Sequence, residues 1–454
     1  MTDTLMVGVS GVRGIVGKDL TDEVVTRYAR AFGLWAGERT PLVVVGRDAR
    51  ASGPAFEQAV IAGLGSVGCD VVRVGLAPTP TIQLAVEHHG AGGGIAVTAS
   101  HNPIEWNALK FIGPDGIFLD GPEGARVQAL AVEGGPGRSR AVKIATDDGA
   151  VERHLHAVLE LSAVDVERIR RRKFAVALDA VRGAGGPVMR ALLERLGCTV
   201  TGINLETDGQ FPRAPEPVPE NLGELSTLVR RTGADVGIAV DPDVDRLAIV
   251  DETGAAIGED YTLAFAVRAV LGGRREAGGG KPSVVCNLST SLVVEDAARE
   301  FGAALVRTPV GEVHVARAIL RLAAVIGGEG NGGVMYPDLH AGRDAPVAAA
   351  LVLELLARTG KRVSELVAAA PRYTIVKAKA PRGPALEPVY AALRRRFADA
   401  QADVQDGLRL AWRDRWLHVR PSNTEPIIRL IAEAPSGALA RELVDEGRRL
   451  CAAS

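Results

Sequence analysis

Three aspartates at alternate positions, Asp241, Asp243 and Asp245, follow the apolar run 236–240 and lead directly into Arg246. Carboxylates this close repel one another unless a cation lies among them. Hard oxygen ligands of this kind suit Mg²⁺, which often keeps coordination positions for water or phosphate oxygens. The neighbouring guanidinium offers a fork of donors for a phosphoryl group. The pattern therefore predicts a magnesium site beside a phosphate, and it also suits a phosphatase that uses Asp241 as its nucleophile.

A hydroxyl, an imidazole and an amide come together in residues 98–103, which include Ser100, His101 and Asn102. The preceding run 95–97 is short and apolar, as is typical of a buried strand. A serine on such a loop, beside a hydrogen-bonding neighbour, can serve as a nucleophile or a phosphate carrier. The same residues are common in an ordinary turn at a strand end. This stretch by itself leaves both interpretations open.

A glycine-rich turn is expected at residues 327–333, where Glu329 and Asn331 lie among five glycines. One carboxylate and one amide can reach adjacent hydroxyls of a sugar while the glycine backbone approaches closely. No Gly-Lys-Ser/Thr follows, so a nucleotide P-loop is excluded. Further along, His340, Arg343 and Asp344 would either support this turn or cap the next helix, and capping is the role expected of Asp344.

Hydroxyls, an amide and arginines follow the expected strand 416–419. Together with free backbone N–H groups they can form a nest for a phosphate, although a simple turn is the alternative. The residues that offer these donors are Arg420, Ser422, Asn423, Thr424 and Arg429. Near the start of the chain, Arg13 stands between glycines that would allow a close approach to an anion, or that would simply form a turn.

Three strand–turn–helix–glycine–strand patterns must position these loops. Their strands are expected at 42–46 and 70–75, at 174–178 and 198–201, and at 283–286 and 303–306. This spacing is typical of βαβ units, in which ligands bind at the carboxyl ends of the strands. After residue 367, short strands and helices predict a smaller fourth domain. The expected domains are 1–145, 146–252, 253–366 and 367–454. An extended proline-rich segment is expected at 211–219, and one loose surface loop is expected where glycines occur at 272–273 and 278–280.

Length and composition agree with an ordinary globular protein. The 454 residues predict about three domains, within a range of two to four. A formal net charge of −2 makes nucleic acid and membrane surfaces unexpected partners. The four cysteines show no paired spacing and are expected to be reduced thiols. Without a signal sequence or a membrane-spanning apolar run, a cytoplasmic location is expected.

The four loops in this order resemble the α-D-phosphohexomutase superfamily, and the resemblance extends from Arg13 to Arg429. It implies three mixed-sheet α/β domains and a C-terminal α+β domain with a helix-covered antiparallel sheet, all around a central cleft. It also implies that Ser100 is carried as a phosphoserine whose phosphate shares one Mg²⁺ with the three aspartates. By the same resemblance Arg246 contacts the phosphoryl group, and Lys110 transfers a proton with His101 alongside.

The resemblance assigns the remaining loops to the substrate. Glu329 and Asn331 would contact sugar hydroxyls, although many relatives have a serine at the position of Asn331 and a histidine shortly after it, where this chain has glycines. Arg13 falls at a recurring family position. The phosphate that is not reacting would be held by Arg420, Ser422, Asn423, Thr424 and Arg429.

The implied activity interconverts hexose 6-phosphate and hexose 1-phosphate through a bisphosphorylated sugar. The residues around Ser100 and the acidic loop look most like phosphoglucosamine mutases, with phosphomannomutase/phosphoglucomutase as the close alternative. A metal-dependent sugar phosphatase and a non-catalytic sugar-phosphate sensor are alternatives from other classes. The chain is expected to be a monomer or a homodimer, with a hexose phosphate as its small-molecule partner.

Overall fold

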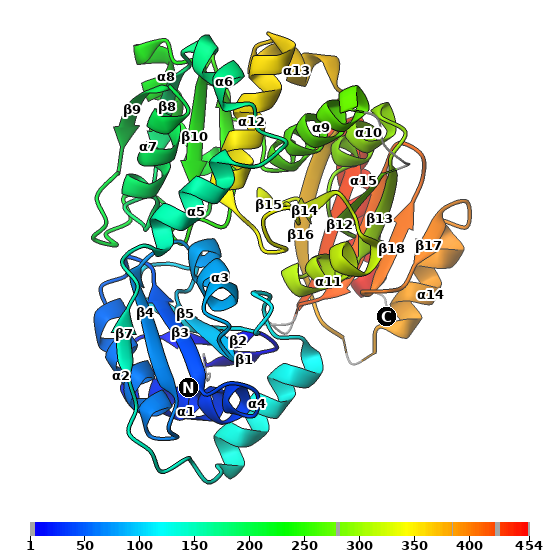
Figure 1. The fold of residues 1–454 in the computed structure, drawn as a ribbon. Helices are drawn as coiled ribbons and strands as arrows, with labels where there is room; N and C mark the ends of the chain where they lie inside the picture. The colour runs from blue at the N-terminus through cyan, green and yellow to red at the C-terminus, as the bar shows by residue number, and fades with distance from the viewer. Residues whose placement is uncertain (1–4, 278–281, 384, 423–426, 453–454) are drawn as a thin grey trace.

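The computed structural model describes residues 5–277, 282–383, 385–422 and 427–452. Four sheets, each with its own helices, follow one another along the chain (Figure 1). Among the described residues, none of the helices combines the length and the apolar composition that a bilayer crossing requires.

The first sheet has seven strands with apolar cores on both faces. Helices α1 (Asp22–Gly37), α2 (Gly53–Gly65) and α4 (Gly121–Glu133) pack on one face, and α3 (Thr79–His88) packs on the other. The pairs β5–β3, β3–β4 and β4–β7 are parallel, and the pairs β1–β2, β2–β6 and β6–β5 are antiparallel. In spatial order the strands are β1 (Met6–Gly8), β2 (Gly11–Ile15), β6 (Trp106–Ile112), β5 (Gly93–Val97), β3 (Leu42–Arg47), β4 (Asp70–Leu76) and β7 (Ile144–Thr146).

The second and third sheets are four-stranded and mixed, and they share one apolar core. Helix α12 (Ala345–Thr359) lies in that core, with every residue from Ala345 to Ala357 buried. A helix that is buried on all sides must be enclosed, and its contacts with α5 (Ala150–Leu159), α6 (Val166–Arg172), α7 (Gly185–Arg195) and α9 (Asp260–Ala277) enclose it. The strands are β8 (Ala175–Asp179), β9 (Thr199–Ile203), β10 (Val236–Val240) and β11 (Leu247–Asp251) in the second sheet, and β12 (Ser283–Asn287), β13 (Ala304–Thr308), β14 (Ile326–Glu329) and β15 (Gly333–Met335) in the third.

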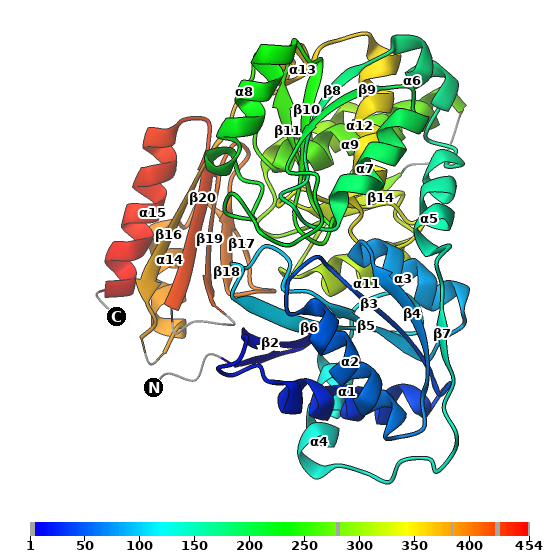
Figure 2. The same cartoon turned by 90° about the vertical axis from the view of Figure 1, so that its left-hand side faces the viewer.

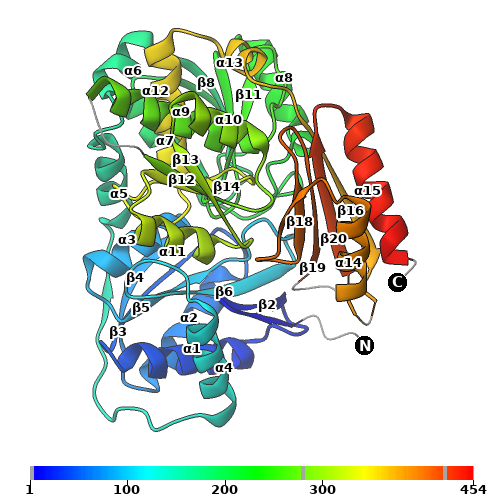
Figure 3. The ribbon, with the colours of Figure 1, turned by 90° about the vertical axis from the view of Figure 1, so that its right-hand side faces the viewer.

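The helices around these two sheets complete the shared body. Helix α11 (Glu312–Leu322) lies between the third and the first sheet (Figure 3), where Val313 and Ala316 pack against Ile117. The other helices are α5 (Ala150–Leu159), α6 (Val166–Arg172), α7 (Gly185–Arg195), α8 (Gly223–Thr232), α9 (Asp260–Ala277), α10 (Leu292–Glu300) and α13 (Val363–Ala369), with a 3-10 turn at Pro219–Asn221.

The fourth sheet is antiparallel and has its own core. Its spatial order is β16 (Thr374–Pro381), β20 (Ile427–Ala434), β19 (Trp416–Pro421), β18 (Leu408–Ala411) and β17 (Gln401–Asp403). Helix α15 (Gly437–Ala452) covers its outer face (Figure 2), and α14 (Glu387–Arg396) packs against α15. The fold class predicted from the sequence is confirmed, including the helix-covered antiparallel sheet.

Two local predictions were wrong. Residues 272–273 belong to α9 rather than to a loop. Gly272 lies beside the Arg358 guanidinium, which donates to the Arg268 and Ala269 carbonyls of the same helix. The rest of the expected loop, 278–280, lies outside the described residues. The glycine-rich turn is shorter than expected, since Gly327 to Glu329 belong to β14 and Gly333 begins β15. The expected domain boundaries remain predictions.

A buried polar joint connects the third and fourth sheets. Ser291, the N-cap of α10, donates its hydroxyl to Glu433 of β20, and the same carboxylate accepts from the Leu292 N–H at 2.8 Å and from Trp416 Nε1 at 2.7 Å. The Ser291 N–H donates to Asp260 Oδ1 at 2.8 Å. Burial raises the pKa of Glu433 and raises the pKa of Asp260 to about 8.

The Asp260 carboxyl should make stability depend on pH. A folded-state pKa above the ordinary value means that its contribution is fully present below the ordinary aspartate pKa and is lost as pH rises toward 8. Asp260→Asn keeps the acceptor for Ser291 but removes the titration. We expect the thermal midpoint of the variant to fall less between pH 5 and pH 8 than that of the wild type, by at least about 2 °C. Identical shifts in the two proteins would contradict this assignment.

Candidate active site

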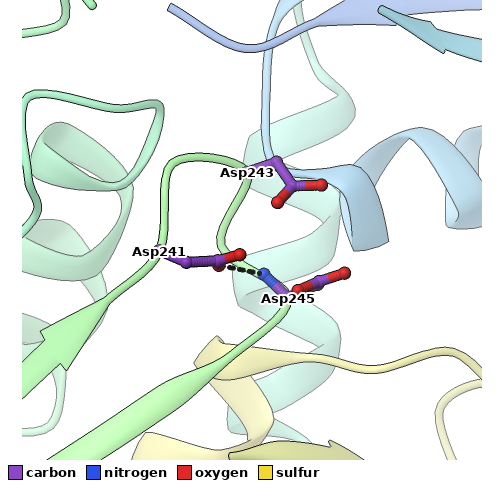
Figure 4. A group of neighbouring side chains, drawn as sticks. All are labelled: Asp241, Asp243 and Asp245. Carbon is purple, nitrogen blue, oxygen red and sulfur yellow. Dashed lines mark hydrogen bonds between the residues drawn. The ribbon is translucent and has the colours of Figure 1, made fainter. Parts of the chain in front are cut away.

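The acidic loop joins the antiparallel strands β10 and β11, so its residues are held from both sides. One carboxylate oxygen of each of Asp241, Asp243 and Asp245 lies within 4.8 Å of the others, and all three side chains are buried. Asp241 Oδ1 accepts the backbone N–H groups of Asp245 and Arg246, both at 3.2 Å, which tightens the turn (Figure 4). Val244 adopts a left-handed φ of 64°, as the tight turn requires.

Cationic and hydroxyl donors surround the acidic loop. Lys110 Nζ, on β6, lies 2.6 Å from Asp243 Oδ2 and 3.4 Å from Asp245 Oδ2. The Thr79 hydroxyl, at the start of α3, donates to Asp243 Oδ2 at 2.6 Å. Arg343 donates to Asp245 Oδ2 at 2.6 Å. The sequence analysis found the lysine but missed the threonine, and it placed this arginine beside the glycine-rich turn or the next helix rather than at the acidic loop.

The pKa values of the carboxyls are shifted in different directions because their neighbours differ. Burial, followed by the charges of Asp245 and Asp243, raises the pKa of Asp241 well above its ordinary value. Burial opposes ionisation of Asp243 as well, but Lys110 and Thr79 outweigh it and hold the pKa of Asp243 below the ordinary range. Burial lowers the pKa of the Lys110 ammonium group, but the carboxylates of Asp243 and Asp245 outweigh it and raise that pKa above its ordinary value.

Ser100 lies directly against this cluster. Strand β5 ends at Val97, and Ser100 follows in a left-handed conformation with φ 48°. Its hydroxyl donates to Asp241 Oδ2 at 2.8 Å, and His101 Nδ1 lies 3.4 Å from the Ser100 Oγ atom. The charge of Arg246, followed by burial, lowers the pKa of His101 well below its ordinary value, so the imidazole is neutral. The serine and the aspartates therefore share one site.

The serine loop is held by a buried arginine that the sequence analysis missed. Arg50 is 1% exposed, and its guanidinium donates to four backbone carbonyls of the loop at 2.6–2.8 Å. Its Nε contacts Asp48 Oδ2 at 3.2 Å, and the same oxygen accepts the Thr98 hydroxyl at 2.6 Å. The ring of Phe211 lies 4.9 Å from the guanidinium carbon. The four carbonyls belong to Ser100, Asn102, Pro103 and Trp106.

The geometry of the acidic loop suits a hard divalent cation. Oδ1 of Asp243 and Oδ1 of Asp245 are buried, and neither accepts a hydrogen bond from the part of the chain that the structure describes. Buried carboxylate oxygens without donors are costly unless a cation coordinates them. An all-oxygen donor set that includes the Ser100 hydroxyl matches the preference of Mg²⁺.

Two further sequence-predicted residues lie near the serine loop. Arg13, on β2, donates to Asn102 Oδ1 at 3.3 Å and pairs across the strands with Ala108 of β6. Arg246 Nε lies 3.7 Å from Asp245 Oδ1, and its NH1 donates to Glu216 at 3.4 Å. Both guanidinium groups thus border the cluster.

The glycine-rich turn is connected to the acidic loop through one side chain. Glu329, at the end of β14, is buried and accepts from Arg343 NH1 at 2.8 Å. Its other oxygen accepts from Asn287 Nδ2 at 2.9 Å and from the Gly311 N–H at 3.2 Å. Asn331 Nδ2 lies 3.4 Å from the same carboxylate. Arg343 therefore bridges Glu329 and Asp245, two groups that the sequence analysis treated separately.

The expected phosphate loop lies on the fourth sheet. Arg420 of β19 pairs across strands with Arg429 of β20, which in turn pairs with Lys379 of β16, so three cationic residues lie in register. Arg420 Nε lies 2.9 Å from Asp406 Oδ2, which also accepts the Val310 N–H at 3.1 Å. Ser422 is buried and follows β19 directly. Asn423 and Thr424 lie outside the described residues.

Comparisons with known proteins cover the whole chain. The four domains of the phosphoglucomutase/phosphomannomutase family match in order: alpha/beta/alpha domain I at residues 4–134, domain II at 152–254, domain III at 258–373 and the C-terminal domain at 376–450.

Individual relatives agree with this match. A phosphoglucomutase/phosphomannomutase of Thermococcus kodakarensis is 40% identical over 98% of this chain and 97% of its own length. A "probable phosphoglucosamine mutase" of Methanopyrus kandleri is 40% identical over 97% and 96%. The crystal structure of a phosphoglucomutase/phosphomannomutase family protein from Burkholderia thailandensis superposes with a TM-score of 0.83 at 28% identity, covering 98% of this chain and 96% of that one.

The serine loop, the acidic loop and their surrounding cations thus occur in a chain whose four domains all match one family of mutases. The resemblance inferred from the motifs is confirmed, and with it the class of enzyme, an isomerase. This chain belongs to the phosphoglucomutase/phosphomannomutase family of the α-D-phosphohexomutase superfamily.

Proposed function

We propose that this phosphohexomutase interconverts hexose 6-phosphate and hexose 1-phosphate through a phosphoserine at Ser100. The observation that carries the proposal is the 2.8 Å hydrogen bond from the Ser100 hydroxyl to Asp241, which puts the hydroxyl within the carboxylate cluster. A structural turn would not require a left-handed serine backed by a buried guanidinium and three carboxylates. Strain of this kind is typical of functional sites.

The carboxylates of the acidic loop and the phosphorylated Ser100 would together hold one Mg²⁺. When bound, the ion neutralises charge on the carboxylates and phosphoryl oxygens and acts as a Lewis acid. Support comes from the two Oδ1 atoms that have no hydrogen-bond donor among the described residues. The family relationship supports the same donor set.

The chain's own residues account for the transfer. The free hydroxyl oxygen of the sugar phosphate forms a bond to the phosphorus of phospho-Ser100, and the bond between phosphorus and the serine oxygen breaks. The proton of the attacking hydroxyl must end on the released serine oxygen. His101 Nδ1 lies 3.4 Å from that oxygen and is placed to deliver a proton to it, and Lys110, the residue to which the family resemblance assigns proton transfer, would take up the proton of the attacking hydroxyl after passing its own proton on. The Lys110 ammonium, with Arg246 and Arg13, would stabilise charge on the phosphoryl oxygens.

The second half of the reaction reverses the orientation of the sugar. The bisphosphorylated intermediate turns around and returns its other phosphoryl group to the serine oxygen, so the enzyme is phosphorylated again and the product carries phosphate at the opposite end. One nest must then accept both phosphates in turn. We assign this nest to the fourth sheet, with Arg420, Ser422, Asn423, Thr424 and Arg429 as its donors.

The preferred hexose is inferred to be glucosamine. Glu329 and Asn331 would face the sugar, and a carboxylate can pair with a 2-ammonium group as well as with a hydroxyl. Mannose and glucose phosphates are the alternative, since the two relatives at 40% identity carry different substrate names.

The first prediction concerns the serine. Ser100→Ala should reduce mutase turnover by at least about 1,000-fold, because the phosphoryl carrier is lost. Ser66→Ala is the control: it removes a hydroxyl that donates to the Gly63 carbonyl outside the site, and turnover should be unchanged. Turnover measured by a coupled assay with a bisphosphorylated sugar as activator, together with intact mass, checks both. Near-normal turnover of the alanine variant, or a base-labile phosphoryl group on Asp241, would contradict the proposal and favour a phosphatase.

The second prediction concerns Arg50. Lysine cannot reach four carbonyls and Asp48 at once, so Arg50→Lys should displace the serine loop and lower kcat by about 10- to 100-fold. Arg73→Lys, which affects an arginine paired with Glu57, is the matched control and should retain normal kcat. The assignment fails if both variants turn over like the wild type.

The third prediction concerns the sugar. With glucosamine, mannose and glucose 1-phosphates assayed side by side, we expect kcat/KM to be highest for glucosamine 1-phosphate, by at least about tenfold. A higher value for mannose or glucose would replace the preferred substrate without affecting the phosphoserine proposal. No transfer with any of the three sugars would contradict both.

A further inference from the structure

A buried histidine–aspartate–histidine cluster lies outside the residues used above. His154 of α5 and His340 both contact one oxygen of Asp344, the N-cap of α12. The distances from their Nε2 atoms to Asp344 Oδ2 are 2.8 and 2.9 Å. The three residues are at most 5% exposed, so the cluster has no access to substrate.

The hydrogen bonds fix the orientation of every member. His340 Nδ1 accepts the Gly342 N–H at 3.2 Å, so its proton lies on Nε2 and is donated to Asp344. The other aspartate oxygen accepts the Val347 N–H at 2.9 Å. Although burial opposes it, the two histidines hold the pKa of Asp344 below its ordinary range. A charged carboxylate with three donors is locked in one rotamer.

Both neighbours of Asp344 in the sequence hold the acidic loop. Arg343 donates to Asp245 Oδ2 at 2.6 Å, and the Ala345 N–H donates to the Val244 carbonyl at 3.2 Å. Any movement of the Asp344 backbone would therefore move two contacts to the acidic loop. The cluster is therefore linked to Asp245 through the backbone of residues 343–345, although none of its three side chains contacts Asp245.

The cluster also reaches the first sheet. The Thr81 hydroxyl lies 2.8 Å from His154 Nδ1, and Thr81 is in the first turn of α3. Thr79, two residues earlier, contacts Asp243 twice: its N–H donates to the Asp243 carbonyl at 2.9 Å, and its hydroxyl donates to Oδ2 at 2.6 Å. The helix that supports His154 thus also holds a second carboxylate of the acidic loop.

We propose that His154, Asp344 and His340 are positioning residues, which hold residues 343–345 against the acidic loop and thereby set the geometry of Asp245 for a divalent ion. The inference rests on the metal site of the proposed function. A purely structural cluster would affect folding stability alone, because apolar replacements can fill a buried site. A positioning cluster must in addition change the affinity of the acidic loop for the ion.

Mn²⁺ binding to the purified chain, measured by electron paramagnetic resonance, separates the two roles. We expect His154→Leu, His340→Leu and Asp344→Asn to weaken Mn²⁺ binding by about tenfold. His154→Gln, which can restore a donor toward Asp344, should bind within about threefold of the wild type. His89→Leu is the matched control: it breaks another histidine–aspartate contact, to Asp147 at 2.8 Å, at the opposite end of α3, and Mn²⁺ binding should be unchanged.

Folded cluster variants that bind Mn²⁺ as the wild type does would overturn the inference, even if their thermal midpoints fall. Should the leucine variants not fold, the near-isosteric Thr81→Val decides, with weakened binding expected and unchanged binding contradicting the proposal. A wild-type chain that binds no Mn²⁺ would overturn the metal site itself, and this inference with it. The two failures can be told apart, because failure of the positioning role alone leaves Mn²⁺ binding by the wild-type chain intact.

Discussion

The structure depends on how three buried carboxylates coexist within one turn of five residues. Their mutual repulsion is offset from outside the turn, by an ammonium group on β6, a hydroxyl on α3 and a guanidinium from the segment before α12. Each donor belongs to a different part of the chain. The acidic loop can therefore keep this geometry only when the first three sheets are assembled.

This requirement explains why the second and third sheets share a core. The all-buried helix α12 begins next to Arg343, and its packing between the two sheets determines where that guanidinium lies. Through Glu329 the same guanidinium connects β14 to the acidic loop. The fourth sheet has a separate core and contacts the third domain through polar groups, which include Glu433 at the start of α10, His418 and Asp406. A separate core joined by polar contacts would allow the fourth sheet to move as a unit.

The parts of the fold that local sequence determines could be predicted. Apolar runs predicted the strands β3, β8 and β12 with bounds within one residue, because a buried strand must be apolar along its length. The chemistry-bearing loops were found because they follow such strands. Gly272 was misread as a loop residue, because close approach of a side chain and a chain break both favour glycine.

The residues that the sequence could not reveal act over long separations. Arg50 contacts a loop about fifty residues away, and Arg343 contacts an aspartate about a hundred residues away. Neither contact has a periodic or local signature in the sequence. His154 and Asp344 are separated further still. Such partners become visible only when the sheets are placed against one another.

The central claim is that one hydroxyl and three carboxylates hold the same divalent ion. Anomalous diffraction from a crystal of the phosphorylated protein with Mn²⁺ tests it most directly. The account predicts a single strong peak about 2.0–2.3 Å from a phosphoryl oxygen on Ser100 and from one oxygen each of Asp241, Asp243 and Asp245. A peak away from these four residues, or occupied sites that bind the serine and the aspartates separately, would contradict it.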